Sequence, residues 1–278
     1  MKRTIKLVIY YFLYQFLFTF LVMAGALVVG IVKNGAEATL QGFDPTAFST
    51  DTQLMALGLI FAGLMMLWHL IHFHYISIPE QVTAFFRKKK SWLVVLLCIP
   101  FVYTVMYLLN QLSAAVNLPD MLEDTFMDMS SNVWGILSIA LVAPILEECL
   151  FRGAIEGHLL TKMKPWAAIL VSAAVFGIIH MNPAQVFYAF LVGIVLGWLY
   201  WRSGSIVPST VAHILNNSLS VVFMNIYGTE SGQSFEEALG EQAQPYIWAL
   251  YALIAVVIFF ELRKIFMSDC NLSDSRNV

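Results

Sequence analysis

Long runs of apolar residues constrain the fold of this 278-residue chain more than any other feature of its sequence. A run of about 18 or more residues with few charges is long enough to cross a bilayer as a helix. A helix satisfies its backbone hydrogen bonds internally, which the hydrocarbon core requires. We therefore predict an all-α polytopic membrane protein with about eight transmembrane helices. Their expected bounds are Ile5–Val32, Gln53–Ile78, Ser91–Leu112, Asn132–Leu160, Pro165–Met181, Gln185–Trp201, Ile206–Tyr227 and Tyr246–Phe266.

The composition agrees with this prediction. Hydrophobic residues make up 59% of the chain and charged residues 12%, against about 25% charged residues in an average soluble domain. We divide the chain into N-terminal transmembrane helices one to three (1–130), a core segment (131–228), and a final segment (229–278). The final segment would hold an external loop, the last helix and a cytoplasmic tail. We expect the lipid bilayer as a partner and expect no nucleic acid.

The positions of the basic residues predict how the helices are oriented. With the N-terminus in the cytoplasm, all 15 lysines and arginines except Lys33 lie in cytoplasmic segments or near the inner end of a span. Lysine and arginine in short loops set the orientation of membrane proteins. We therefore expect a multi-pass protein of the cell membrane with both termini in the cytoplasm. The loop Asp120–Asn132 would then be external.

Three of the predicted spans carry polar residues that are costly in a bilayer. An ionisable group costs at least about 2.5 kcal/mol at the centre of a membrane helix, so each one needs a structural or functional reason. These residues are Glu147, Glu148 and Arg152 in span four, His180 in span five, and His213 and Asn217 in span seven; Phe176 lies one turn before His180.

Helical geometry separates the roles of the two adjacent glutamates. Glu148 and Arg152 are four residues apart, so they share one face of the helix and can pair. Glu147 is turned about 100° away and must face a different partner, for which we expect His180. Pro144, one turn earlier, predicts a kink that opens space beside the glutamates. We expect the polar faces of spans four, five and seven to meet in one polar cavity.

Each polar residue also has a structural interpretation. A glutamate–arginine pair can serve only as a clamp, and a membrane histidine can be a packing residue. The joint occurrence of Glu147, His180, His213 and Asn217 favours a functional site over packing. Elsewhere, His69, His72 and His74 could place two side chains on a metal, but an aromatic belt at the membrane interface explains them more simply. The chain has no HExxH helix, no GxSxG elbow and no Walker loop.

The three polar stretches together resemble the CPBP family, the type II CAAX prenyl proteases and their bacterial relatives in bacteriocin processing and self-immunity. The resemblance covers about residues 133 to 225, and the order of the motifs along the chain makes it specific. The family motifs EExxxR, FxxxH and HxxxN read here as Glu147-Glu148-xxx-Arg152, Phe176-xxx-His180 and His213-xxx-Asn217.

The resemblance implies an intramembrane endopeptidase with its catalytic core in residues 131–228. By position, Glu147 and His180 would activate water, and His213 and Asn217 would stabilise the oxyanion. Glu148, Arg152 and Phe176 would support the site. The substrate would be a membrane-associated peptide or protein, either of CAAX type or a precursor peptide.

Three alternatives stay open at this point. The family has also been interpreted as metalloproteases, and a zinc ion could be held by Glu147, His180 and His213. We favour metal-free chemistry, with no cofactor, because no second histidine is fixed to the first as in HExxH. A non-catalytic membrane immunity or binding protein could keep the same polar core. A proton-coupled transporter is a further possibility, although the sequence shows no internal repeat.

Overall fold

The computed structural model describes residues 2–41, 44, 50–227 and 243–274 of the chain. Within these residues the chain is helical and contains no strand, which confirms the predicted all-α class. The helices are α1 (Lys2–Asn34), α2 (Ala36–Gln41), α4 (Thr52–His72), α5 (Ile78–Phe86), α6 (Ser91–Val116), α7 (Glu123–Ser130), α8 (Val133–Leu137), η1 (Ser138–Val142), α9 (Ala143–Glu147), η2 (Glu148–Glu156), α10 (Gly157–Leu160), α11 (Pro165–Ile178), α12 (Pro183–Ser203), α13 (Ile206–Tyr227) and α15 (Gln244–Asp274).

Seven helical segments of the described chain are long and apolar enough to cross a membrane. The segments α8, η1, α9, η2 and α10 follow one another without interruption and form one of the seven, Val133–Leu160. Span five of the sequence prediction, Pro165–Met181, is the shorter helix α11. Its 14 residues reach about 21 Å, less than the roughly 30 Å thickness of the hydrocarbon core.

The early end of α11 has a local cause. Met181 has a positive φ of 52°, which a right-handed helix does not allow, and Pro183 then begins α12. The turn also carries Asn182, whose side chain is fully buried and donates a hydrogen bond to Asp120 (2.7 Å). The sequence located this break, because span five was predicted to end at Met181 and the next span to begin at Gln185; residues 179–181 of the predicted span lie beyond α11.

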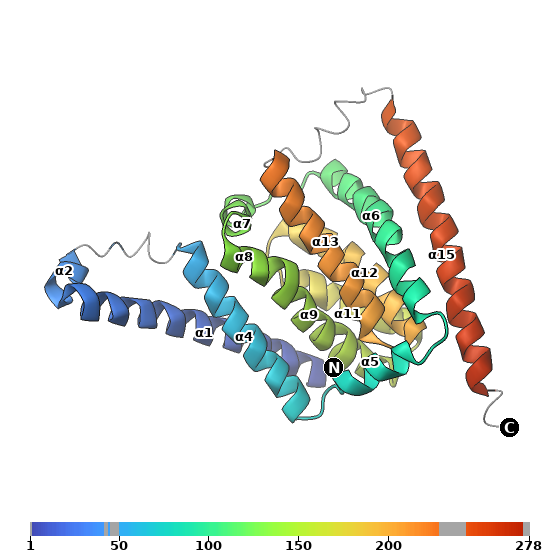
Figure 1. Cartoon of the computed structure of the whole chain (residues 1–278), viewed down its shortest axis with the longest axis horizontal. Coiled ribbons are helices and arrows are strands. Elements are labelled where there is room, and N and C mark those ends of the chain that lie inside the picture. Colours follow the sequence, from blue (N-terminus) through green and yellow to red (C-terminus); the bar gives the residue numbers. More distant parts are fainter. Residues whose placement is uncertain (1, 42–43, 45–49, 228–242, 275–278) are drawn as a thin grey trace.

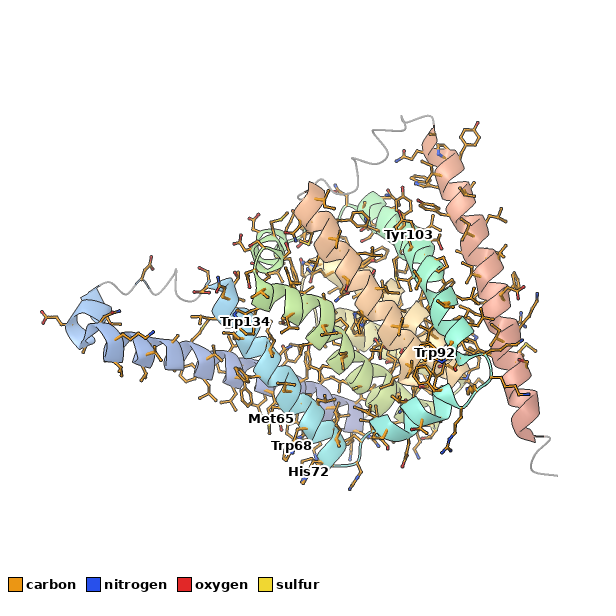
Figure 2. The ribbon with its side chains drawn as sticks, in the orientation of Figure 1. Met65, Trp68, His72, Trp92, Tyr103 and Trp134 are labelled. Atoms are coloured by element: carbon orange, nitrogen blue, oxygen red, sulfur yellow. The ribbon has the colours of Figure 1, made fainter. Side chains whose placement is uncertain are left out.

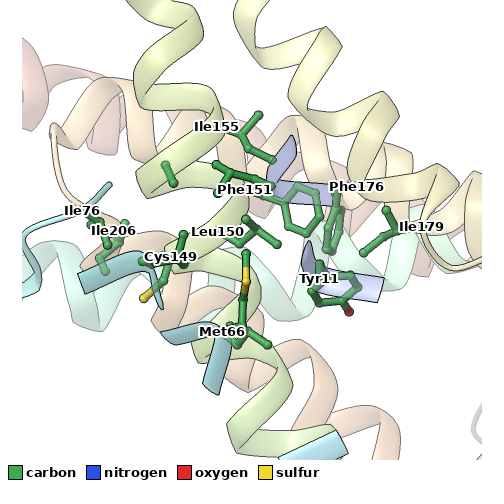
Figure 3. Packing of buried hydrophobic residues seen from close by; sticks show 14 of the residues in the cluster. Tyr11, Met66, Ile76, Cys149, Leu150, Phe151, Ile155, Phe176, Ile179 and Ile206 are labelled. Atoms are coloured by element: carbon green, nitrogen blue, oxygen red, sulfur yellow. The ribbon is translucent and has the colours of Figure 1, made fainter. Parts of the chain in front are cut away.

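The helices pack in pairs around two hydrophobic clusters (Figure 1). Helix α1 packs along α4, α11 along α12, and α15 along α6. One cluster surrounds α9 and η2 and collects side chains from α1, α4 and α11; Figure 3 shows part of it, with Leu150 and Phe151 at its centre. The other cluster joins α6, α12, α13 and α15. The helix Val133–Leu160 therefore lies inside the bundle, while much of α1 extends away from it.

The loops at one end of the bundle are tied together by polar contacts. Arg3 donates to the carbonyl oxygen of Tyr75, and Lys88 donates to that of Ser203 (2.6 Å). Gln81 accepts from the backbone N–H of Ile206 at the same end. The basic segments near the N-terminus, residues 87–90 and Arg202 therefore share one end, and Figure 1 shows the beginning of α1 and the end of α15 towards that end. Figure 2 places Trp68 and His72 at the end of α4 on this side.

The opposite end of the bundle gathers acidic and amide residues. Asp120 contacts Asn182 there, and the Asn225 side chain donates to the carbonyl oxygen of Ser130 (2.9 Å). The predicted external loop after residue 228 lies outside the described residues up to residue 242. The separation of basic and acidic ends agrees with the charge asymmetry of the sequence.

We predict that the basic end faces the cytoplasm. A single cysteine placed at Lys89 in an otherwise cysteine-free protein should react with a membrane-impermeant reagent only after the cells are opened. A cysteine at Glu123, in α7 at the other end, should react in intact cells. Labelling of the Lys89 position in intact cells would contradict the predicted orientation.

Candidate active site

The backbone of the central helix is widened on both sides of Glu147. Residues of η1 and η2 form π-helical turns, in which the N–H of residue i+5 rather than i+4 bonds to the carbonyl of residue i, an arrangement that is frequent at functional sites. The N–H of Ala143 accordingly bonds to the carbonyl of Ser138. The next carbonyl, that of Ile139, would need an N–H from residue 144, and Pro144 has none. The predicted distortion at Pro144 thus takes the form of a π-helical turn with a free carbonyl oxygen.

Asn217 on α13 satisfies this carbonyl. Its side-chain nitrogen donates to the Ile139 oxygen (3.0 Å), while its own oxygen accepts from Asn216 (3.1 Å). Asn216 in turn accepts a hydrogen bond from the Tyr188 hydroxyl (2.8 Å). An unmade backbone bond in a membrane helix is costly, so Asn217 stabilises the distorted turn. One N–H of its amide remains for a further partner, because an asparagine amide has two.

Glu148 and Arg152 form the ion pair that their spacing predicts. The Arg152 Nη1 atom lies 2.8 Å from the Glu148 Oε1 atom, and both side chains are fully buried. Arg152 also donates through Nη2 to the carbonyl oxygen of Gly193 on α12 (3.2 Å). Its guanidinium lies 4.5 Å from the centre of the Phe176 ring. The charge is therefore held by η2, α11 and α12 together.

His213 on α13 connects the two glutamates. Its Nδ1 atom lies 2.9 Å from Glu148 Oε1, and its Nε2 atom lies 3.7 Å from Glu147 Oε2. A carboxylate oxygen accepts hydrogen bonds, so Nδ1 carries the proton and the Nε2 lone pair faces Glu147. We call Glu147, Glu148, Arg152 and His213 the buried charge cluster. A carboxylate that fixes the tautomer and orientation of a histidine is a recurring arrangement in hydrolases.

Glu147 has a second contact, from α1. The Tyr11 hydroxyl donates to Glu147 Oε1 at 3.5 Å, so the carboxylate lies between Tyr11 on one oxygen and His213 on the other. Only 7% of Glu147 is exposed. The described contacts of Glu147 are thus with His213 and Tyr11 rather than with His180, the partner expected from the sequence.

His180 completes the C-terminal end of α11. Its Nδ1 atom bonds to the Phe176 carbonyl oxygen (2.8 Å), and the carbonyls of Val175, Gly177 and Ile178 accept from backbone N–H groups of the following turn. A carbonyl only accepts, so His180 carries its proton on Nδ1 and leaves Nε2 as an acceptor. Its ring packs edge-on against Phe176 (5.1 Å between centroids).

Phe176 is the apolar centre of the site. Its ring is buried and lies in edge-on contact with both His180 and His213, while Arg152 lies near its centroid. Such ring and cation contacts orient polar side chains without using their hydrogen-bonding atoms. Phe176 therefore joins His180 to the buried charge cluster.

The sequence did not identify four of the polar residues around the site. Tyr11 lies in an apolar run, and Tyr188 and Asn216 lack a motif partner of their own. Glu156 is fully buried one turn after Arg152, and neither of its carboxylate oxygens has a hydrogen-bond partner within the described residues. Glu156 could have been found from the sequence, because Glu148, Arg152 and Glu156 follow one another at intervals of four residues and so share one helix face.

Gly193 and Gly197 of α12 face the side of η2 that carries Arg152 and Glu156. A Cβ atom at Gly197 would lie 2.7 Å from Glu156 Oε2 and 3.1 Å from Ile169, and one at Gly193 would touch Ala173 and Phe176. The lack of side chains at these two glycines therefore makes room for the polar face of η2.

The zinc alternative requires Glu147, His180 and His213 to converge on one point. Among the residues that the structure describes, no three histidine, cysteine, aspartate or glutamate side chains are grouped so that they could hold a metal ion. The His213 Nδ1 and His180 Nδ1 atoms bond to Glu148 and to a backbone carbonyl, which leaves the Nε2 atom of each ring as an acceptor. Within the described residues, Glu147, His180 and His213 are thus not grouped as the zinc alternative requires.

Comparison with known proteins places the site within a known family segment. Residues 129–219 match the family model described as type II CAAX prenyl endopeptidase Rce1-like. A relative from Bacillus subtilis (strain 168), named "Putative membrane peptidase YdiL", is 32% identical over 116 residues, which cover 42% of this chain and 46% of the relative. The chain thus spans about half the length of that relative. No solved structure matches the chain. The matched segment contains all three motifs and the buried charge cluster, so residues 129–219 are similar to the type II CAAX prenyl endopeptidases in the part of the chain that forms the site.

Proposed function

We propose that the protein is an intramembrane endopeptidase that hydrolyses a peptide bond of a membrane-associated substrate. The observation that supports this best is the geometry around Glu148, whose Oε1 atom contacts both Arg152 and His213, 2.8 and 2.9 Å away. This places His213 beside Glu147 in the middle of a membrane-spanning helix. A charged group at such depth is costly, and a carboxylate beside an oriented histidine is suited to proton transfer.

Glu147 acts as the general base in this proposal. Its carboxylate removes a proton from water while the water oxygen attacks the carbonyl carbon of the substrate. The His180 Nε2 atom, left unprotonated by the capping bond of Nδ1, accepts the second hydrogen of the water and orients it. General-base catalysis of this kind contributes about 10²–10⁴-fold to a rate.

The His213 Nε2 atom, which lies 3.7 Å from Glu147 Oε2, then receives the proton from Glu147. The resulting imidazolium is stabilised by the Glu148 carboxylate at Nδ1. It becomes a donor to the oxyanion only once the reaction has begun, and such donors stabilise the transition state selectively. The free N–H of Asn217 is the second oxyanion donor. Collapse of the tetrahedral intermediate breaks the C–N bond, and the proton passes to the leaving amine.

The chemistry of this scheme requires no cofactor, and we propose that catalysis is metal-free. Purified protein that has been dialysed against a chelator should then retain its peptide-cleaving activity and hold no stoichiometric zinc. The measurement pairs elemental analysis with a cleavage assay before and after chelation, in the same detergent. Activity that is lost on chelation and returns with zinc, but not with buffer, would establish the metalloprotease alternative.

The test of the function is the identification of cleaved substrates. Membranes from cells that carry the wild-type protein and from cells with the Glu147→Gln variant are compared for new peptide termini. We expect termini that depend on Glu147 and that map to peptides or proteins associated with the membrane, either CAAX-type or precursor peptides. A phenotype that survives the substitution, with no Glu147-dependent termini, would instead favour a non-catalytic immunity or binding protein.

A further inference from the structure

The first helix of the chain reaches the candidate general base, although it lies far outside the family segment 129–219. Tyr11 is only 6% exposed, and its hydroxyl is the donor to Glu147 Oε1. Its ring meets Phe151 edge-on, with 6.4 Å between centroids. Figure 3 shows Tyr11 beside Phe176 and Ile179, among the side chains that surround the site. The contact joins residues 136 positions apart, so the fold and not the local sequence creates it.

Contacts on two faces of α1 fix the position of Tyr11. Leu7 and Tyr11, four residues apart, are buried on the face that packs against the central helix Val133–Leu160. Tyr10 and Tyr14 lie on a neighbouring face and contact His69 of α4. The Tyr14 hydroxyl is 2.9 Å from His69 Nδ1, and the centroid of the Tyr10 ring is 4.8 Å from that of the histidine ring. The contact with α4 fixes the rotation of α1, and this rotation directs Tyr11 at Glu147.

His69, which the sequence pattern assigns to an aromatic belt at the membrane interface, thus has a defined partner in Tyr14. His69 is buried and bonded to Tyr14, and it packs on Phe73 and Tyr75. Further along the same two helices, α1 and α4 also pack closely at Gly58, where a Cβ atom would lie 2.5 Å from the Thr19 Cα atom. The two N-terminal helices therefore pack as a pair beside the site.

We propose that Tyr11 is a positioning residue for Glu147, so that α1 is part of the active site. This inference rests on the proposed function. The Tyr11 hydroxyl fixes Oε1 and thereby turns Oε2 towards His213 and the attacking water. A hydrogen bond to a carboxylate is stronger than one between neutral groups, which makes the contact suited to holding the side chain in one orientation.

The first experiment compares Tyr11→Phe with Tyr10→Phe. Each change removes one hydroxyl from the same helix, but Tyr10→Phe keeps the ring that packs on His69 and leaves the bond of Tyr11 to Glu147 in place. We expect kcat to fall about tenfold to a hundredfold in Tyr11→Phe with little change in KM, the effect of one hydrogen bond to a charged group. Tyr10→Phe should keep the kcat and KM of the wild type.

A second measurement is independent of catalysis. The thermal stabilities of wild type, Tyr11→Phe, Glu147→Ala and the double variant form a cycle, and the two changes should be non-additive if the side chains interact. A purely additive cycle, or equal losses of kcat in Tyr11→Phe and Tyr10→Phe, would overturn the proposal. A non-additive cycle in a protein whose Glu147→Gln variant is fully active would show that the contact exists and that the proposed catalytic role of Glu147 has failed.

Discussion

Replacement of Glu147 by glutamine is expected to lower kcat by roughly two to four orders of magnitude while the protein remains folded. Glutamine has nearly the same volume, and its side-chain oxygen can still accept from the Tyr11 hydroxyl. It cannot accept a proton from water at neutral pH, so the attacking nucleophile is no longer activated. The measurement is the cleavage rate in detergent, together with the thermal unfolding midpoint of the same preparation.

Glu156→Gln is the matched control for this change. Glu156 is another buried glutamate of the same membrane-spanning helix, and it lies beside Gly197 and Arg152 rather than beside the proposed water. We expect Glu156→Gln to cleave substrate at a rate close to that of the wild type. A Glu147→Gln protein that is fully active would show that another residue is the base.

Contacts within one helix could be predicted from the sequence. The four-residue spacing of Glu148 and Arg152 determines that they share a face, and the structure joins them at 2.8 Å. The same rule separates Glu147 from Glu148, and the two carboxylates indeed contact different atoms of His213. The helical class and most of the helix positions followed from the apolar runs for the same reason, because hydropathy is a local property.

Contacts between helices could not be predicted in this way. The assignment of His180 as the partner of Glu147 required knowledge of how α11 crosses the central helix, and no spacing rule supplies it. The side chain that does reach Glu147 from outside the motifs, Tyr11, is one of many aromatic residues in an apolar run. Its role depends on the rotation of α1, which Tyr14 and His69 set from a third helix.

Two backbone features had only weak signals in the sequence. Pro144 indicated a distortion, but a proline can produce a kink or a π-helical turn, and the choice depends on whether another helix can satisfy the freed carbonyl. Asn217 does so here. The end of α11 was predicted at Met181 rather than at Ile178, because the bond of His180 to the last turn and the contact of Asn182 with the distant residue Asp120 leave no mark on the hydropathy.

Replacement of Glu148 by alanine is expected to destabilise the protein by roughly 3–5 kcal/mol, because it leaves a buried charge without its partner. Glu148 and Arg152 are both fully buried. The Gly193 carbonyl and the Phe176 ring, which also contact Arg152, are uncharged, and the nearby Glu156 carboxyl makes no hydrogen bond with the guanidinium. His213 would also lose the acceptor that fixes its Nδ1 proton. The variant should therefore lose activity together with stability, whereas Glu147→Gln loses activity alone.

The chain provides an exposed pair as a reference. Glu261 and Lys264 are 2.6 Å apart on α15, and their side chains are 50% and 71% exposed. Exposed ion pairs contribute about 0–1 kcal/mol, so Glu261→Ala should shift the unfolding midpoint far less than Glu148→Ala. Both variants are measured by thermal unfolding in the same detergent.

The double variant Glu148→Gln/Arg152→Met distinguishes two roles of Glu148: compensating the charge of Arg152 and supporting His213 in catalysis. Removing both charges of a buried pair costs much less stability than removing one, since no uncompensated charge remains. We expect this protein to recover most of the stability lost in Glu148→Ala but to remain inactive, because a glutamine amide holds His213 Nδ1 more weakly and does not stabilise the imidazolium that the proposed mechanism forms. A recovery of activity along with stability would mean that Glu148 serves only to compensate Arg152. A Glu148→Ala protein that is inactive but as stable as the wild type would mean that the two glutamates have the opposite roles.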